Sequence, residues 1–195
     1  MKLTALLFPL TASLLVATAL PVAAQQKSAP QKLLSAQSDI GFVFKQMGVP
    51  VEGHFKKFDA QINFDATKPA TSKVAFTVDI ASATLGSPET DAELPKAVWF
   101  NTAKFPQATF ASSGFKALGG GKYEVAGKLS IKGQSREVVV PVTMTQAGAV
   151  TTAVGVFPIK RLGFKIGEDE WADTSMVADD VQVKFKLALS GVGKL

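Results

Sequence analysis

The sequence predicts an all-β fold, either an antiparallel barrel or a sandwich, from two observations, and its aromatic content indicates a large dry core or an apolar cavity. Apolar residues alternate with polar ones at a period of two in a series of runs between residues 40 and 189, which is the pattern of half-buried strands. Turns that contain glycine or proline separate these runs at short spacing, as hairpins do. The chain has 14 Phe against 2 Trp and 1 Tyr, so most of its large rings need an apolar interior and no hydrogen-bond partner.

The N-terminus has the pattern of a cleavable export signal. Lys2 precedes an uncharged apolar stretch, and the small residues Val22-Ala23-Ala24 follow it as a cleavage site. A retained membrane anchor is the alternative, but Pro21 and the small-residue tail favour removal. We therefore expect a cleaved signal peptide over residues 1–24, a flexible lead-in over 25–37 and a single folded domain over 38–195.

The predicted strands follow the lead-in, and in each of them one face is apolar and the other polar. This alternation is typical of an antiparallel sheet with one wet face. Two further strands are expected around residues 51–58 and 110–115. The apolar positions of the alternating runs are Ile40, Phe42 and Phe44; Ala60, Ile62 and Phe64; Val74, Phe76, Val78 and Ile80; Tyr123, Val125, Leu129 and Ile131; Val138, Val140, Val142 and Met144; and Val181, Val183, Phe185, Leu187 and Leu189.

One short helix is predicted among the strands, over residues 87–94. Ser87 can cap its first turn, Pro88 suits the first helical position, and Pro95 ends it. Turns are predicted at Gly119-Gly120-Gly121 and at Lys132-Gly133-Gln134, each joining two strands as a hairpin.

The composition excludes several classes of function. With 0 Cys and 1 His, the chain has no material for thiol catalysis, a disulfide framework, a zinc finger, c-type haem attachment or a multi-histidine metal site. The formal charge is +5, but basic and acidic residues alternate along the chain, which does not favour a nucleic-acid surface. We expect no cofactor, no metal and no nucleic-acid partner.

Candidate catalytic groups are few. His54 is the only imidazole base, and because Phe55 occupies the apolar face of its strand, His54 is expected to point outward. The carboxylates Asp91 and Glu93, and the run Glu168-Asp169-Glu170, are typical of solvated loops, and no GxSxG motif is present. We predict that the protein is not an enzyme. The alternative is an enzyme that acts on a lipid head group with His54 or Asp91 as acid or base.

The remaining signal is a concentration of large apolar side chains over residues 42–110. These side chains either fill a core or line a hollow. An eight-stranded barrel can enclose one small ligand, and each CH₂ group buried there contributes roughly 0.8 kcal/mol. The side chains are Phe42, Phe44, Phe55, Phe58, Ile62, Phe64, Trp99, Phe100, Phe105 and Phe110.

Four stretches in order resemble the YceI-like family, exported proteins whose lipocalin-like barrel holds polyisoprenoid lipids. The resemblance extends from Ser38 to Ser190. The stretches are SDIGFVFKQMGVPVEGHFKKFDAQINFD, with a G-x-F-x-x-F pattern at Gly53, Phe55 and Phe58; AVWFNTAKFPQATFAS; YEVAGKLSIKGQSREVVVPV; and FPIKRLGFKIGEDEWADTSMVADDVQV.

The resemblance implies an antiparallel eight-stranded lipocalin-like barrel with short helical segments near its mouth. It also implies a set of side chains that contact an isoprenoid tail and a second set near the head group. The tail set is Phe42, Phe44, Phe55, Ile62, Phe64, Trp99, Phe110 and Phe164. The head set is Arg161, Lys160 and Asp91, of which Arg161 matches the arginine of the family's closing block.

Departures from the family pattern bear on the head group. Many members have Arg-Asp-x-His-Leu where this chain has Thr90-Asp91-Ala92-Glu93-Leu94, and the family often has Asp where Leu162 stands. Without that Arg and His, an anionic clamp is weakened, and a neutral head such as a quinone is favoured over a polyprenyl phosphate. The residues that match the proteobacterial periplasmic branch are Leu94, Pro95, Trp99, Phe100 and Asn101.

The resemblance therefore implies a periplasmic carrier for an isoprenoid lipid or quinone. Some members of that branch accompany membrane b-type cytochromes, so such a cytochrome is a candidate partner. A homodimer through one barrel face stays open. The alternatives are a stress-related or interaction protein with a solidly packed barrel, and the head-group enzyme described above.

Overall fold

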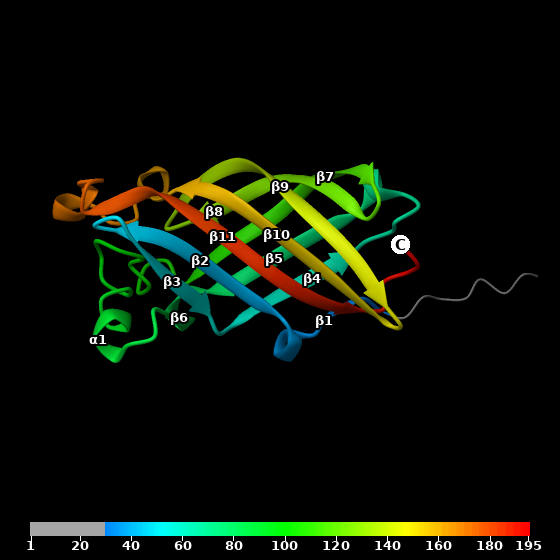
Figure 1. Ribbon diagram of the computed structural model, residues 1–195, viewed down its shortest axis with the longest axis horizontal. Helices are drawn as coiled ribbons and strands as arrows, with labels where there is room; N and C mark the ends of the chain where they lie inside the picture. The colour runs from blue at the N-terminus through cyan, green and yellow to red at the C-terminus, as the bar shows by residue number, and fades with distance from the viewer. Residues whose placement is uncertain (1–29) are drawn as a thin grey trace, which may run out of the picture.

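The computed structural model describes residues 30–195 and shows an all-β antiparallel fold (Figure 1). Its strands form one 11-stranded sheet that curls strongly about an apolar interior. The strands are β1 (Lys32–Leu33), β2 (Asp39–Gln46), β3 (Val49–Phe55), β4 (Phe58–Asn63), β5 (Lys73–Asp79), β6 (Ala83–Thr84), β7 (Gln107–Gly119), β8 (Lys122–Ile131), β9 (Gln134–Ala147), β10 (Val150–Lys160) and β11 (Val177–Ser190). The all-β antiparallel class is thus confirmed, whereas the predicted signal peptide lies outside the described residues.

The predicted number of eight strands is wrong, because β1, β6 and β10 escaped the sequence pattern. The strands β1 and β6 are two residues long, too short to show a period. In β10 the inward positions include the small residues Thr151, Ala153 and Gly155, while Val154 and Val156 point outward and are exposed. Both faces of β10 are therefore similar in hydropathy, and the alternation that marks a strand is lost.

The sheet is also not closed by hydrogen bonds, so half-barrel describes it better than barrel. The hydrogen-bonded order is β4-β5-β7-β8-β9-β10-β11-β2-β3-β6, and β1 pairs with β11 beside this path. The strands β4 and β6 end the order on its two sides. The last strand, β11, pairs with β10 on one side and with β2 on the other. The C-terminal strand therefore lies next to one of the first strands of the chain.

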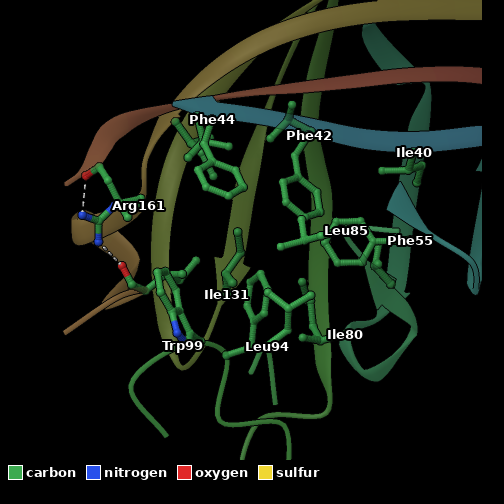
Figure 2. Close-up of a pocket in the computed structure, with 18 of the residues that line it drawn as sticks. Ile40, Phe42, Phe44, Phe55, Ile80, Leu85, Leu94, Trp99, Ile131 and Arg161 are labelled. Carbon is green, nitrogen blue, oxygen red and sulfur yellow. Dashed lines mark hydrogen bonds between the residues drawn. The ribbon is translucent and has the colours of Figure 1, made fainter. Parts of the chain in front are cut away.

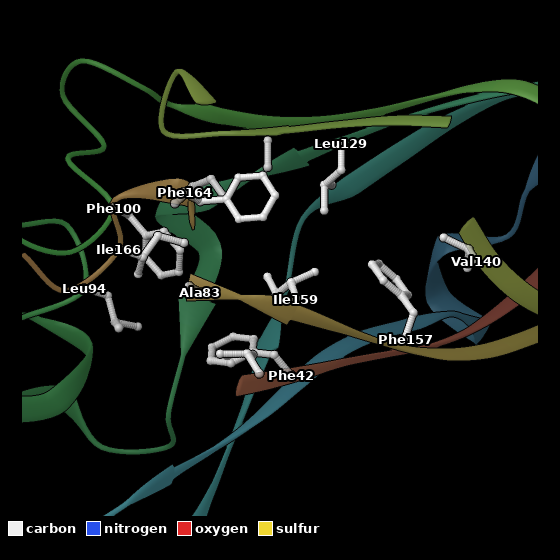
Figure 3. Packing of buried hydrophobic residues seen from close by; sticks show 13 residues of the cluster. Phe42, Ala83, Leu94, Phe100, Leu129, Val140, Phe157, Ile159, Phe164 and Ile166 are labelled. Carbon is white, nitrogen blue, oxygen red and sulfur yellow. The ribbon is translucent and has the colours of Figure 1, made fainter. Parts of the chain in front are cut away.

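The predicted apolar faces point into the curl and form the core. The buried side chains form two clusters, one toward each end of the half-barrel along the direction of its strands. In the first, Phe42, Phe157 and Phe164 pack with aliphatic side chains from the facing strands (Figure 3). In the second, Phe64 packs with its ring edge-on to Tyr123, the two centroids 5.3 Å apart. The alternation in the sequence therefore identifies the inner surface correctly.

Short helical segments connect the strands: η1 (Ser35–Gln37), η2 (Pro69–Thr71), η3 (Ile80–Ser82), α1 (Pro88–Asp91), η4 (Arg161–Phe164) and η5 (Asp169–Ala172). The predicted helix over 87–94 is observed as the shorter α1, and the hydroxyl of Ser87 caps it by accepting from the Thr90 N–H. Figure 1 shows α1 and the η4–η5 segment, coloured orange, at the same end of the molecule.

The described part of the predicted lead-in, residues 30–37, contains β1 and η1. Strand β1 pairs with the end of β11, Lys32 opposite Ser190. The side-chain amide of Gln31 also bonds the backbone of Phe64 in both directions. Within residues 30–195, no helix is both long and apolar enough to span a bilayer.

Candidate ligand-binding site

An apolar cavity of about 250 Å³ opens at the end of the half-barrel that carries α1, η4 and η5. We call it the mouth cavity. Figure 2 shows Phe42 and Phe44 descending from β2 into it, with Leu94 and Trp99 opposite. Its polar lining residues Gln46, Thr90 and Glu93 are exposed, so this is the end that faces solvent.

A second cavity of about 160 Å³ lies deeper in the half-barrel, and every residue that lines it is apolar. We call it the distal cavity. The two cavities share Ile40, Val78, Leu129, Phe157 and Val183 as walls. Because a strand rises about 3.3 Å per residue, the stretch of β11 from Val177 at the mouth to Leu189 is about 40 Å long. The two cavities thus lie next to each other along the half-barrel, with these five residues between them.

The structure brings most of the predicted tail residues to these cavities. Phe42, Phe44, Phe55 and Trp99 line the mouth cavity, and Ile62, Phe64 and Phe110 line the distal one. Phe164 lines neither, because η4 directs its ring into the core, where it is 2% exposed.

Arg161 lines the mouth cavity, but its guanidinium is fully engaged by the backbone. A guanidinium has five N–H donors, and all five are used here. Nε donates to the carbonyl of Ala178 (3.1 Å), Nη1 to those of Ile166 (2.9 Å) and Gly167 (2.9 Å), and Nη2 to those of Trp171 (2.6 Å) and Val177 (2.6 Å). Burial lowers the pKa of Arg161, while the nearby Asp179 carboxylate acts in the opposite direction. A head group can take a donor from Arg161 only if one of these bonds opens.

The other two predicted head-group residues lie away from the cavity lining. Lys160 is exposed on the outer face of β10 and pairs with Asp180 at 2.8 Å, which raises the pKa of Lys160. Asp91 accepts from the Thr84 hydroxyl and from the Leu85 N–H, each at 2.6 Å. These bonds lower the pKa of Asp91 and tie α1 to β6. The structure therefore does not bring Arg161, Lys160 and Asp91 together.

A buried lysine, Lys132, links two segments at the mouth, and the sequence did not predict this role. Lys132 is 6% exposed in the β8–β9 turn, where it has a positive φ of 47°. Its ammonium donates to the carbonyls of Lys165 (2.5 Å) and Val98 (3.3 Å) and pairs with Glu168 (3.0 Å). It thereby joins the segment that carries Trp99 to the segment that carries Trp171. The two indole rings contact each other in the lining of the mouth cavity, tilted by 43° with centroids 5.3 Å apart.

Other lining residues were also missed, for reasons that lie in tertiary structure. Trp171 lies in the fourth stretch that resembles the YceI-like family, but the residues around it do not alternate, because they form the short helix η5. Thr90 lies on the single turn of α1, and only the fold of that segment directs it to the cavity. The inward positions Val181 and Val183 of β11 were predicted as apolar strand positions, and that signal was sufficient to find them.

The structure places the candidate base His54 outside both cavities. His54 points outward, as expected, and its Nδ1 lies 2.9 Å from the Asp39 carboxylate with both side chains about half exposed. Neither residue lines the mouth cavity or the distal cavity. Within residues 30–195, no group of three or more His, Asp or Glu side chains has a metal-binding arrangement.

Comparison with known proteins identifies relatives over most of the chain. A family model described as "YceI-like domain" matches residues 32–189. "Protein YceI" of Salmonella arizonae is 33% identical over 187 residues, which cover 93% of each chain. A UPF0312 protein of Azotobacter vinelandii is 39% identical over 88 residues, so this chain spans about half the length of that relative.

Solved structures show the same fold. The crystal structure of BcnA from Burkholderia cenocepacia is 49% identical, with a TM-score of 0.78 over 80% of this chain and 98% of that one. A polyisoprenoid-binding domain from Saccharophagus degradans has a TM-score of 0.65 over 83% of this chain and 98% of that one. At 14% identity, the second likeness shows the fold alone.

Proposed function

Because the chain belongs to the YceI-like family, we propose that it binds an isoprenoid lipid in the periplasm, with the tail in the two cavities and the head at the mouth. The observation that carries the proposal is the pair of apolar cavities in line, with polar lining residues only at the exposed end. Such a hollow offers a long apolar chain a dry wall and offers a polar ligand nothing deeper than the mouth. Neither cavity alone reaches about 300 Å³, the lower bound of typical ligand sites, but the two together exceed it.

The tail contacts in this proposal are Phe42, Phe44, Phe55 and Trp99 at the mouth and Ile62, Phe64 and Phe110 beyond it. Phe164 packs in the core outside the cavities, and Lys160 pairs with Asp180 on the outer face, so neither is a tail contact. That the ligand is a polyisoprenoid is consistent with the named activity of the Saccharophagus degradans domain of the same fold.

A neutral head group, such as a quinone ring, fits the mouth better than a phosphate does. All five donors of Arg161 are already bonded. Glu93 adds a carboxylate to the lining, although Lys96 pairs with it. A phosphate would therefore meet a carboxylate and no free guanidinium, whereas quinone oxygens need only one or two neutral donors, such as Thr90 or Gln46.

Tryptophan fluorescence offers a direct test of binding. The chain has 2 Trp, and both Trp99 and Trp171 line the mouth cavity. Titration with short-chain ubiquinones should quench this emission in a saturable way. Affinity should rise about fourfold per added tail carbon until the cavities are full, since each buried CH₂ is worth roughly 0.8 kcal/mol.

Controls separate the tail from the head. The tail-less benzoquinone should quench only weakly, and a prenyl phosphate of equal tail length should bind less tightly than the quinone. Mass spectrometry of an organic extract from protein purified out of its native host should then identify the natural ligand. An affinity that does not depend on tail length, together with an empty native protein, would favour the packed-barrel alternative.

The enzymatic alternative places the chemistry at His54 or Asp91. Since His54 lies on the outer face and Asp91 is bonded to β6, neither side chain faces a ligand held in the mouth cavity. A turnover of a prenyl phosphate that His54→Ala abolished would revive this alternative.

A further inference from the structure

The wall of the half-barrel is interrupted between β9 and β10. The two strands pair from their connecting turn as far as Val154 with Thr143, and the pairing ends there although both strands continue. Beyond this point β9 carries Pro141 and β10 carries Pro158, both exposed. Proline has no N–H to donate and is typical of strand edges. We call this unpaired stretch the seam, and its two prolines oppose its closure.

Only a thin wall separates the seam from the hollow. A groove on the outer surface runs over it, and Val142 and Phe185 line both this outer groove and the distal cavity. Gly155, which lies opposite Phe185 across the β10–β11 pair, contributes no side chain. A Cβ at this glycine would overlap the Phe185 ring. The Phe185 ring therefore covers the inner face of β10 at Gly155, where the Pro141 carbonyl of β9 also comes close. A rotation of this ring would uncover the inner side of the seam.

The surface around the seam combines apolar and basic side chains. Val139, Val154 and Val156 are 59%, 40% and 52% exposed, on strands whose outer faces would otherwise be polar. The basic side chains Lys122, Lys184 and Lys186 line the outer groove, together with one carboxylate, Asp39, which lies against His54. Lys184 pairs with Glu52, while among residues 30–195 Lys122 and Lys186 make no ion pair. Exposed apolar side chains with lysines beside them are complementary to an anionic bilayer surface.

The mouth end has a different character. It also exposes apolar side chains, Met47 at 69% and Val49 at 63%, but α1 and η5 at this end each carry two acidic residues, and Lys96 there is paired with Glu93. An anionic surface would repel this end. Charge therefore favours the seam over the mouth as the face toward a bilayer.

We propose that the seam is a lateral portal, docked on an anionic phospholipid bilayer by Val139, Val156 and the flanking lysines, through which an isoprenoid chain passes into the distal cavity. This inference rests on the proposed function and adds the route of entry and the membrane surface. Phe185 acts as the movable part of the wall. The ligand would enter tail first through the side of the half-barrel.

Docking is tested with fluorescent labels. The chain has 0 Cys, so the variants Val156→Cys and Met47→Cys each carry a single label site for an environment-sensitive dye. The label at 156 should shift to the blue with phosphatidylcholine vesicles that contain phosphatidylglycerol, and not with phosphatidylcholine alone. A shift only at position 47, or at neither position, would overturn the docking face.

Passage is tested by transfer of retinol, a fluorescent isoprenoid, from anionic vesicles to the protein, followed by energy transfer from Trp99 and Trp171. The double variant V139D/V156D should slow transfer at least about tenfold, because a loss of about 1.4 kcal/mol in docking is a factor of ten. Its retinol content at equilibrium should not change. The matched control M47D/V49D, with two exposed apolar residues replaced at the mouth, should transfer at the wild-type rate.

The movable wall is tested with Phe185→Ala, which should speed transfer severalfold, and with Phe185→Leu in case the smaller residue impairs folding. If wild-type protein binds no retinol at equilibrium, the proposed function fails and the portal with it. If retinol binds but the seam and Phe185 variants transfer at the wild-type rate, the portal alone is overturned.

Discussion

At the residue scale, Arg161 is the side chain on which the shape of the mouth depends. It is 2% exposed and bonds carbonyls of β11, of the turn after η4 and of η5. These segments share no strand pairing at the mouth. A buried charge with all of its donors satisfied holds them at fixed distances, and its loss would leave several carbonyls without partners.

Arg161→Lys should therefore destabilise the protein. A lysine has three donors, so at least two of the five carbonyls lose their partner, and each costs about 1–3 kcal/mol. We expect the free energy of unfolding to fall by at least about 2 kcal/mol in denaturant titrations. Arg136→Lys is the matched control, because Arg136 is exposed and donates one bond, to Gly163. Unchanged stability with a selective loss of affinity for anionic heads would instead assign Arg161 to the ligand.

Two further single substitutions test whether the phenylalanines line a hollow. Phe44→Asp and Phe110→Asp place a carboxylate in the mouth cavity and in the distal cavity, respectively. A charged carboxylate draws water into the cavity that contains it. Lipid co-purification should therefore be lost, while the strand signal in circular dichroism persists. Phe44→Leu, which keeps the wall apolar, should retain lipid. Wild-type lipid content in both aspartate variants would mean that the ligand, if any, lies elsewhere.

At the scale of elements, α1 is positioned to cover the mouth, and Asp91 is its attachment. The carboxylate receives bonds from Thr84 and Leu85, and the same short segment carries Thr90 and leads to Glu93, both in the mouth lining. Movement of this helix would change the mouth without disturbing the sheet. The attachment depends on the charge of one side chain and so on pH.

We expect ligand release to accelerate in acid. The pKa of Asp91 is lowered in the folded protein, chiefly by the Thr84 hydroxyl, so its stabilising effect is fully present above about pH 4, the ordinary carboxyl range. That effect is lost as the pH falls through the lowered pKa. Stopped-flow release of a bound quinone, followed by recovery of tryptophan emission, should show this rise. Asp91→Asn should release faster at neutral pH and lack the acid-dependent step; a wild-type profile in this variant would contradict the attachment.

The elements also show where sequence reasoning succeeds and where it stops. Period-two alternation found β2, β4, β5, β8, β9 and β11 with the correct inner face, because apolar side chains alternate there with polar ones along the strand. It missed β10, since Gly155 and Ala153 face inward while Val154 and Val156 face outward. Small inward residues and exposed outward valines are also the features of β10 on which the proposed portal depends. A functional surface thus removed the signal that would have revealed the strand.

The site was predictable in part for a similar reason. Inward phenylalanines of strands were found, because strand period fixes their direction. The contacts of Arg161 and Lys132 were not, because they join segments distant in sequence through backbone carbonyls, which no pattern of side chains encodes. Resemblance identified Arg161 as important, and the structure shows that its donors are directed to the backbone.

At the scale of the whole molecule, the two cavities share a wall, and we infer that they form one elongated hollow whose narrow point is that wall. Val183 and Leu129 stand at the wall that both share, whereas Leu187 lines the distal cavity alone. A ligand long enough to occupy both must pass this point. The length of tail that the protein accepts is therefore set there and at the distal end.

Substitutions at these two depths should shorten the accepted tail by different amounts. Val183→Phe places a ring at the narrow point, so quinones with long tails should lose the affinity that the distal cavity provides, while those with the shortest tails keep theirs. Leu187→Phe fills only the far end and should affect the longest tails alone. Tryptophan quenching across a series of tail lengths measures both, and unfolding in denaturant checks that overpacking, which costs about 1–3 kcal/mol, leaves each variant folded. If both variants lower the affinity of every tail equally, the cavities do not act in series, and the tail follows another path.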